Sequence, residues 1–175
     1  MMYRNMAPYI VNFSVLGMAF FGLIIGGCSA KHYSISEPKM ITIKSPKLKF
    51  ADTGYIRHEG EAVEVELFTA GVAVEKISID KEVCVSSGCM SEEKFVKEYL
   101  YPDYPKDTMR RILQGSDIFG GINKEELCQG TLYQTIRNDE MDIIYRRKGN
   151  DIFFKDRLNA LMIKISNLDT NQSLP

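Results

Sequence analysis

Cysteine is the residue type in this chain whose spacing bears most directly on chemistry. The 175 residues include four cysteines, at positions 28, 84, 89 and 128. Cys84 and Cys89 enclose Val-Ser-Ser-Gly, a spacing that fits neither the Cys-x-x-Cys redox motif nor the common zinc-binding pairs. A structural disulfide that closes a turn is the favoured interpretation of this pair. Cys128 is then expected to be a free thiol, buried or half-exposed.

Residues suited to catalysis or metal binding are otherwise few. The two histidines, His32 and His58, offer little from which to build a His-based triad or a metal centre. Acidic residues gather in residues 139–142 without the spacing of an EF-hand. The glycines of residues 115–121 lack the Lys-Ser/Thr that completes a phosphate-binding loop. We therefore expect no catalytic residue, no metal ion and no enzymatic activity.

The charge balance excludes one class of partner. The chain has 22 basic and 23 acidic residues, for a formal net charge of −1. A nucleic-acid-binding protein carries a basic surplus that neutralises phosphates, and this chain has none. We expect no nucleic-acid partner. Arg146, Arg147 and Lys148 form a short basic run, which we interpret as a solvated hairpin tip; the alternative is a patch that meets anionic headgroups.

The N-terminal segment contains the strongest motif. A polar start with Arg4 precedes an apolar run from Ile10 to Ile25, which ends in Ile25-Gly26-Gly27-Cys28. This ending resembles the lipobox of bacterial lipoproteins. The resemblance implies that residues 1–27 are a signal peptide, and that Cys28 carries a diacylglycerol and an N-acyl chain as its covalent modification. The alternative is an uncleaved membrane helix, because the run nearly reaches the roughly 20 residues needed to span a bilayer.

Lipidation at Cys28 sets the expected location. Each buried CH₂ contributes about 0.8 kcal/mol, and two or more chains hold a protein stably on a membrane. We therefore expect a lipid-anchored protein of the cell envelope, facing the periplasm. The outer membrane is favoured because the residue after Cys28 is Ser29, not the aspartate that is linked to inner-membrane retention in some bacteria. No other cofactor is expected. Export also permits the Cys84–Cys89 disulfide.

The remaining chain is expected to form one domain. We assign residues 28–46 to a lipidated N-terminus and tether, residues 47–168 to an ordered domain, and residues 169–175 to a flexible tail. Val63 to Leu67 alternates apolar and charged residues, which predicts a strand with one buried face. A strand over 72–79 changes its apolar phase, which indicates a bulge. Residues 47–56 form a plausible preceding strand, with Gly54 marking a kink or a close backbone approach.

Two short helices are predicted between these strands and a second set. Ser91 is a helix N-cap for a helix that runs to about Leu100. Pro105 is predicted as the first residue of a second helix, which Gly115 ends. After a loop over 120–126, strands follow at 131–137, 141–147 and 152–165, joined by hairpin turns. The expected fold class is α+β, a curled antiparallel sheet with two short helices as a lid.

This order of elements is similar to the LolA/LolB family of periplasmic lipoprotein carriers, and closest to the membrane-anchored receptor LolB. The resemblance covers residues 63–165. Residues 63–70 resemble the strand that enters the family's protruding loop. Residues 105–115 resemble its second helix, opened by a proline and closed by Ile-Leu-x-Gly. Tyr133-Gln134, Asp142-Ile143-Ile144-Tyr145 and residues 161–165 resemble later strands.

The resemblance implies an incomplete β-barrel whose helical lid covers an apolar cavity for acyl chains. Such a protein would bind acyl chains and take part in transferring lipoproteins or lipids to the outer membrane. Its partners would be the membrane, an acylated protein or lipid ligand, and a periplasmic carrier. LolB touches the membrane through a leucine in Asn-Pro-Leu-Gly, and here Leu67 or Phe68 would replace it. The roof of the cavity would consist of Phe95, Leu100, Met109, Ile112 and Leu113.

A second interpretation stays open. The same sheet with a filled core would be a non-enzymatic envelope lipoprotein that acts as a protein-interaction or adhesion module. An open apolar cavity between the sheet and the helices favours the carrier. Close packing through that space favours the interaction module.

Overall fold

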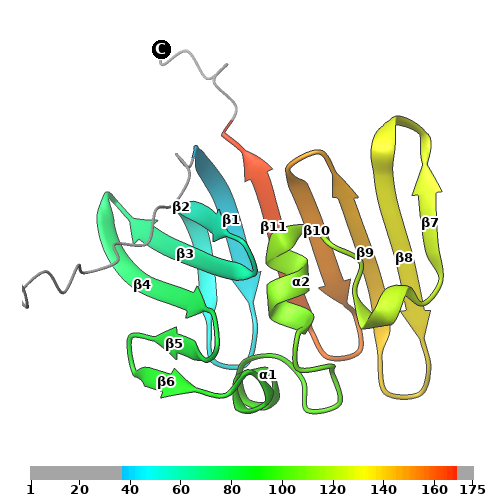
Figure 1. Cartoon of the computed structure of the whole chain (residues 1–175), viewed down its shortest axis with the longest axis horizontal. Helices are drawn as coiled ribbons and strands as arrows, with labels where there is room; N and C mark the ends of the chain where they lie inside the picture. Colours follow the sequence, from blue (N-terminus) through cyan, green and yellow to red (C-terminus); the bar gives the residue numbers. More distant parts are fainter. Residues whose placement is uncertain (1–36, 169–175) are drawn as a thin grey trace, which may run out of the picture. The chain divides into compact units, whose positions relative to one another are not determined.

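A computed structural model of the chain describes residues 37–168 (Figure 1). The chain divides into two compact units, Met1–Lys31 and His32–Pro175, and the described residues belong to the second. That unit contains every strand, helix and core residue described below. A segment with its own hydrophobic core has the attributes of an independently folding domain.

Eleven strands form one sheet. They are β1 (Pro38–Lys44), β2 (Lys49–Glu59), β3 (Ala62–Thr69), β4 (Val72–Ile79), β5 (Val83–Val85), β6 (Gly88–Met90), β7 (Lys124–Leu127), β8 (Thr131–Arg137), β9 (Asp142–Lys148), β10 (Asp151–Asp156) and β11 (Leu161–Asn167). Two α-helices, α1 (Glu92–Tyr99) and α2 (Thr108–Gln114), and two single turns of 3-10 helix, η1 (Phe119–Gly121) and η2 (Cys128–Gly130), lie between β6 and β8 in the chain.

The sheet is antiparallel, and the chain runs from its centre to one edge and then from the opposite edge back to its centre. Its order is β6-β5-β4-β3-β2-β1-β11-β10-β9-β8-β7, so the first and last strands are neighbours. The chain runs from β1 to the β6 edge, passes through the helices, and resumes at the opposite edge with β7. The two edge strands do not pair with each other, so the sheet is not closed. The α+β class and the antiparallel sheet with two short helices are therefore confirmed.

The sheet curves around helix α2. This helix contacts both β3 and β10, which are separated by β2, β1 and β11 in the sheet. Four strand spacings amount to about 19 Å in a flat sheet, whereas a helix is about 10–12 Å wide. A flat sheet could not bring both strands to one helix. Figure 1 shows α2 in front of the central strands, with α1 at one end of the sheet.

Local sequence explains how both helices begin and end. The Ser91 side chain accepts a hydrogen bond from the Lys94 amide (3.2 Å), which makes it the N-cap of α1 as predicted. Helix α2 ends at Gly115 in the left-handed conformation, also as predicted. The start of α2 differs from the prediction. Thr108 donates to the Pro105 carbonyl from both its amide and its hydroxyl, so Pro105 opens a turn and the helix begins three residues later.

Strand β1 corrects the predicted domain boundary. We expected Pro38–Lys44 within the tether, but these residues pair with β2 on one side and β11 on the other. Ile41 and Ile43 are buried in the core. Two isoleucines among Lys and Pro residues gave little periodic signal, and the partners that stabilise this strand lie far away in sequence. The domain therefore includes residue 38, whereas residues 28–36 and 169–175 lie outside the described residues.

The other strands largely follow the predictions, and the differences are at β6, β7 and the β10–β11 hairpin. The pairing of β3 with β4 shifts register between Leu67 and Phe68, which is the expected bulge. A Cβ on Gly54 would lie 2.8 Å from the Glu66 carbonyl oxygen, which is the expected close approach. Strand β7 overlaps the predicted 120–126 loop, and β6 was not predicted. The predicted 152–165 strand is a hairpin, β10 and β11, with a turn in between.

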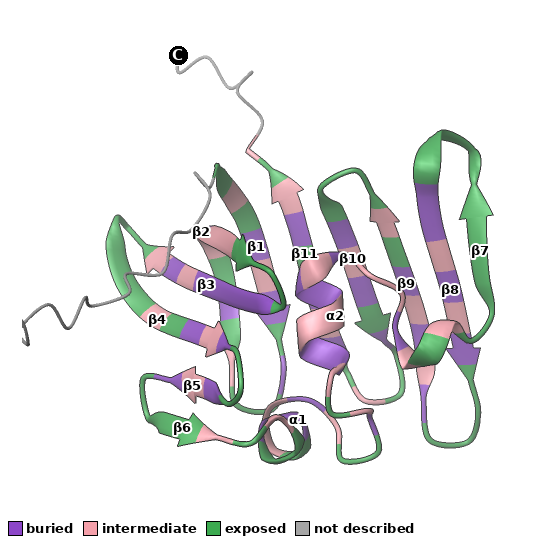
Figure 2. Cartoon of the chain, viewed as in Figure 1, coloured by how far each residue is buried: buried purple, intermediate pink, exposed green. Residues whose placement is uncertain are grey.

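The core fills most of the space between the sheet and the helices. Tyr145, Phe95 and Phe154 are the largest side chains with less than 2% exposure. Figure 2 shows buried residues in α2, in β3, in β8 and in the strands behind α2, whereas β7 and the turn between β3 and β4 are exposed. The inner face of the sheet is therefore largely closed by packing around α2.

Candidate functional site

A groove of about 580 Å³ lies on the inner face of the sheet, beyond the C-terminal end of α2. Its lining includes Gly149 and Asn150 of the turn between β9 and β10. Figure 1 shows this turn at one end of the sheet. The strands contribute Lys39, Ile56, His58, Lys124, Glu126, Leu132, Arg147, Ile152 and Ile165, and the helix end and the turns contribute Leu113, Gln114, Gly115, Ser116, Asp117, Gly149 and Asn150. The groove therefore combines residues from both halves of the sheet.

The floor of the groove is an apolar row across the strands. Register places Ile165 of β11 opposite Ile152 of β10, and Ile152 opposite Arg147 of β9. Arg147 in turn lies opposite Leu132 of β8. Residues directly opposite in an antiparallel sheet share one face, so these side chains lie side by side on the inner face.

Helix α2 bounds the groove at its C-terminal end. Gly115 has a φ of 66°, which L side chains rarely adopt, and a Cβ at this position would lie 3.1 Å from Arg147 Cγ. Gly115 therefore both ends the helix and lets the Arg147 side chain pass close to it. Arg110 holds the same helix to the sheet by donating to the carbonyls of Glu61 (2.7 Å) and Asp80 and by pairing with Glu92.

The structure separates the five predicted roof residues. Leu113 lines the groove. All five are at most 4% exposed and belong to the packed core, but Phe95, Leu100, Met109 and Ile112 do not line the groove. The prediction that these four roof an open cavity is wrong, because side chains of the sheet already fill the space below them.

The residues predicted to contact a membrane, Leu67 and Phe68, are not the exposed apolar residues of their hairpin. Leu67 has 0% exposure and packs in the core, so it cannot touch a membrane. Phe68 is half-exposed and packs edge-on against Tyr55, with ring centroids 5.5 Å apart. The exposed apolar residues of this hairpin lie on β4 instead, where Val72 is 66% and Val74 is 50% exposed. Val74 lies at the register shift, and Val72 pairs with Thr69 next to the exposed turn of the hairpin.

Charged groups around the groove are mostly paired. Glu126 pairs with Lys124 (3.2 Å), and Asp117 pairs with Arg111 (3.7 Å). Lys39 pairs with Glu37 (3.3 Å) and donates to Asn167 Oδ1 (2.6 Å). Partial burial lowers the pKa of His58, so this imidazole is neutral at pH 7.

Arg147 is the residue that our sequence interpretation misplaced. We expected the run 146–148 at a solvated tip, but Arg147 continues the inward series of Ile143 and Tyr145 on β9. Its side chain donates to the carbonyls of Gly115 (3.2 Å) and Gly130 (3.3 Å). A run of three basic residues carries no alternation, so the sequence gives no signal for the one that points inward.

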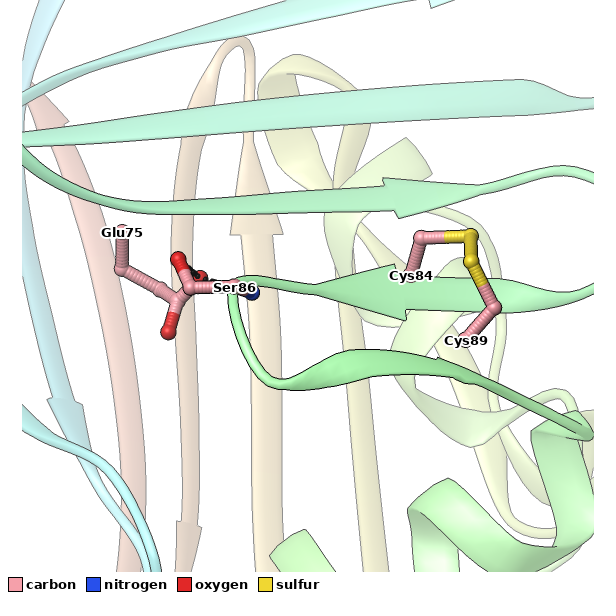
Figure 3. Close-up of a disulfide and its surroundings, with 4 residues drawn as sticks. All are labelled: Glu75, Cys84, Ser86 and Cys89. Carbon is pink, nitrogen blue, oxygen red and sulfur yellow. Dashed lines mark hydrogen bonds between the residues drawn. A yellow bond between two sulfur atoms is a disulfide. The ribbon is translucent and has the colours of Figure 1, made fainter.

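The cysteines lie at a different part of the sheet. Cys84 and Cys89 face each other on β5 and β6 and are joined by a disulfide (Figure 3). Glu75 of β4 accepts hydrogen bonds from the Ser86 amide (2.8 Å) and hydroxyl (2.6 Å), and so holds the turn of the same hairpin. Cys128 is a free thiol and is exposed, not buried or half-exposed as predicted. Cys28 lies outside the described residues.

Two kinds of site are not found within residues 37–168. No group of three or more His, Cys, Asp or Glu side chains there is arranged to hold a metal ion. None of the helices in this part of the chain has the length and apolar character to cross a membrane.

The fold and the groove define an α+β protein with an open antiparallel sheet and a ligand-sized depression on its inner face. Comparisons with protein-family models, with curated proteins and with solved structures find no match for this chain.

Proposed function

We propose that this chain is a lipid-anchored periplasmic lipoprotein that binds acyl chains in the groove and takes part in lipoprotein or lipid transfer to the outer membrane. The observation that carries the proposal is the groove itself, whose floor is the apolar row of Ile165, Ile152 and Leu132, with Leu113 at the end of α2. Its volume falls in the range of about 300–1,000 Å³ that is typical of small-molecule sites.

Burial of a hydrocarbon chain would supply the binding energy. Each CH₂ moved from water to an apolar site contributes about 0.8 kcal/mol, so ten such groups contribute about 8 kcal/mol before the costs of association. The open, curved antiparallel sheet with helices on its inner face agrees with what the LolA/LolB resemblance implies. The exposed Val72 and Val74 offer an apolar hairpin with which the domain could meet a membrane.

The test is binding of a neutral apolar fluorophore, N-phenyl-1-naphthylamine, to residues 32–175, followed by displacement with a twelve-carbon acyl ligand. We expect saturable binding and displacement. Leu113→Gln places an amide at the groove wall and should weaken binding about tenfold. Leu158→Gln changes a leucine that is 58% exposed and should leave binding within about twofold. Thermal unfolding of each variant shows that the fold persists.

A second candidate function is supported by the packed core. Because Phe95, Leu100, Met109 and Ile112 are buried, the space that a large cavity would occupy is closed. All four residues of the edge strand β7 are exposed. If wild-type protein binds neither fluorophore nor acyl ligand, the acyl-binding proposal is lost and a protein-interaction or adhesion module takes its place.

A further inference from the structure

Arg147 is a charged residue in an apolar row. Its neighbours on the adjacent strands are Ile152 and Leu132, and its predecessors on the same face of β9, Ile143 and Tyr145, are fully buried. Arg147 is itself half-exposed, and a guanidinium beside such side chains is favourable only where water or an anion solvates the charge. The question is therefore which group compensates the charge of Arg147.

The other charges of the groove lining do not compensate Arg147. Both carboxylates in the lining, Asp117 and Glu126, have cationic partners of their own. Within residues 37–168, no carboxylate forms an ion pair with Arg147. Arg147 is thus the cation of the described groove lining that is left without an anion.

Two hydrogen bonds hold the Arg147 guanidinium in place and leave its other N–H donors without an acceptor among the described residues. Its Nε–H donates to the Gly115 carbonyl and one Nη1–H donates to the Gly130 carbonyl. Arginine has five N–H donors in a fixed planar fork. Three of these donors are uncommitted among the described residues, and the two bonds that exist fix the orientation of the fork. An oriented guanidinium with free donors is suited to bidentate binding of a carboxylate or a phosphate.

A second polar group beside Arg147 also lacks a partner. The Tyr145 hydroxyl is buried and forms no hydrogen bond within the described residues. Burial raises the pKa of Tyr145, so the phenol keeps its proton and remains a donor. The charges of Arg147 and Asp117, both in the groove lining, act on this hydroxyl. Tyr145 is 0% exposed and does not line the groove, so the free donors that a ligand in the groove would meet belong to Arg147.

We infer that the groove selects single acyl chains that carry an anionic headgroup, with Arg147 binding the anion and the apolar row beside it receiving the chain. The inference rests on the proposed acyl binding and names the ligand class of that site. A fatty-acid carboxylate and a lipid phosphate share this chemistry, because each places an anionic group at the end of a hydrocarbon chain.

The experiment compares headgroups on one chain length. Dodecanoate, dodecyl phosphate and neutral dodecanol each displace N-phenyl-1-naphthylamine from residues 32–175. We expect the better of the two anions to bind at least about tenfold more tightly than the alcohol, because a charge-assisted bidentate contact is strong in a partly buried site. Whether dodecanoate or dodecyl phosphate binds more tightly shows whether the site prefers a fatty-acid carboxylate or a lipid phosphate.

Two variants and one control locate the effect. Arg147→Gln should remove the preference for the anions while dodecanol binding changes less than about twofold. Arg147→Lys keeps the charge and should keep a preference, but a smaller one because the fork is lost. Arg146→Gln is the matched control, since Arg146 is exposed on the opposite face of the same strand and should keep the full preference. Thermal unfolding of all three variants checks the fold.

The outcomes separate this inference from the proposal on which it rests. Equal binding of anions and alcohol, or an anion preference that survives in Arg147→Gln, overturns the inference and leaves acyl binding intact. No displacement by any ligand, together with no fluorophore binding, overturns both. A preference that is lost in Arg147→Gln and kept in Arg146→Gln supports both.

Discussion

Asp156 is the residue that ties the segment between the two helices to the sheet. Its carboxylate is fully buried and accepts from the Tyr104 hydroxyl, Asn159 Nδ2 (2.7 Å) and the amides of Leu158 (3.0 Å) and Asp142 (3.1 Å). Burial alone would raise the pKa of Asp156, but these hydrogen bonds outweigh it and lower the pKa below its usual value. The carboxylate is thus ionised and satisfied in the folded protein.

This environment predicts a pH-dependent contribution to stability. A carboxyl group with a lowered folded pKa stabilises the fold above its unfolded pKa, near 3.9, and that contribution is lost as the pH falls through the folded pKa. Asp156→Asn should lower the free energy of unfolding at pH 7 by about 2–3 kcal/mol. The loss should shrink below pH 4. Urea unfolding between pH 3 and 7 measures it.

Asp139→Asn is the matched control for this prediction. Asp139 is exposed in the turn between β8 and β9. A surface substitution of this kind changes stability by no more than about 0.5 kcal/mol. An Asp156→Asn variant as stable as wild type at pH 7 would show that the network around Asp156 does not hold the fold.

Residue-scale features divide into those that sequence can predict and those that it cannot. Ser91 and Gly115 act through local backbone geometry, so their residue types predicted their roles. The role of Asp156 depends on Tyr104, which is 52 residues away, and the role of Arg147 depends on which face of β9 it occupies. Register with strands distant in sequence determines both.

At the scale of elements, the β5–β6 hairpin forms one edge of the sheet with only three residues in each strand. Strands this short gain little from pairing alone. The Cys84–Cys89 disulfide and the hydrogen bonds from Ser86 to Glu75 add two further constraints to the same hairpin (Figure 3). Because α1 follows β6 directly, this edge also fixes where α1 begins.

The disulfide predicts both a chemical and an energetic result. Alkylation of exported protein without reductant should label Cys128, and reduction should expose Cys84 and Cys89 as well. A closed loop of this size contributes about 2 kcal/mol by chain entropy, so the double variant Cys84→Ser with Cys89→Ser should unfold more easily by about that amount. Cys128→Ser is the control and should unfold as wild type does. Labelling of Cys84 and Cys89 before reduction would contradict the pairing.

Element prediction succeeded where the pattern is local and failed where it is not. Alternation in β3 and hairpin turns in β8 to β10 were visible in the sequence. Strand β7 has four exposed residues, Lys-Glu-Glu-Leu, and pairs only with β8, so no buried face marks it. Strand β1 is stabilised by β11, whose residues lie more than 100 positions later in the chain.

In the whole protein, the proposed lipid anchor at Cys28 precedes the domain whose described residues, 37–168, contain the groove. The anchor is predicted from the Ile-Gly-Gly-Cys motif alone. The groove arises because the meander brings β1 and β11 together at the centre and curves both halves of the sheet around α2. Sequence could not distinguish filled from open space there, because inward-facing residues look alike in both cases.

The anchor is tested by changing its cysteine. Cys28→Ser should leave a longer, unprocessed precursor that incorporates no fatty acid, because the sulfur that accepts diacylglycerol is absent. Growth with a clickable fatty acid followed by gel fluorescence measures the label. The double variant Cys84→Ser with Cys89→Ser should keep its label. Undiminished labelling of Cys28→Ser would show that the fatty acid is attached elsewhere in the chain.

The central claim is that the groove holds an acyl chain, and native mass spectrometry tests it most directly. The full chain, extracted gently from the envelope, should carry a noncovalent lipid at one per protein, in addition to the covalent acyl chains on Cys28. Leu113→Gln should lose most of that noncovalent lipid while Leu158→Gln retains it. A wild-type protein that carries no lipid beyond its covalent anchor, or one whose bound lipid is unchanged by Leu113→Gln, would contradict the account.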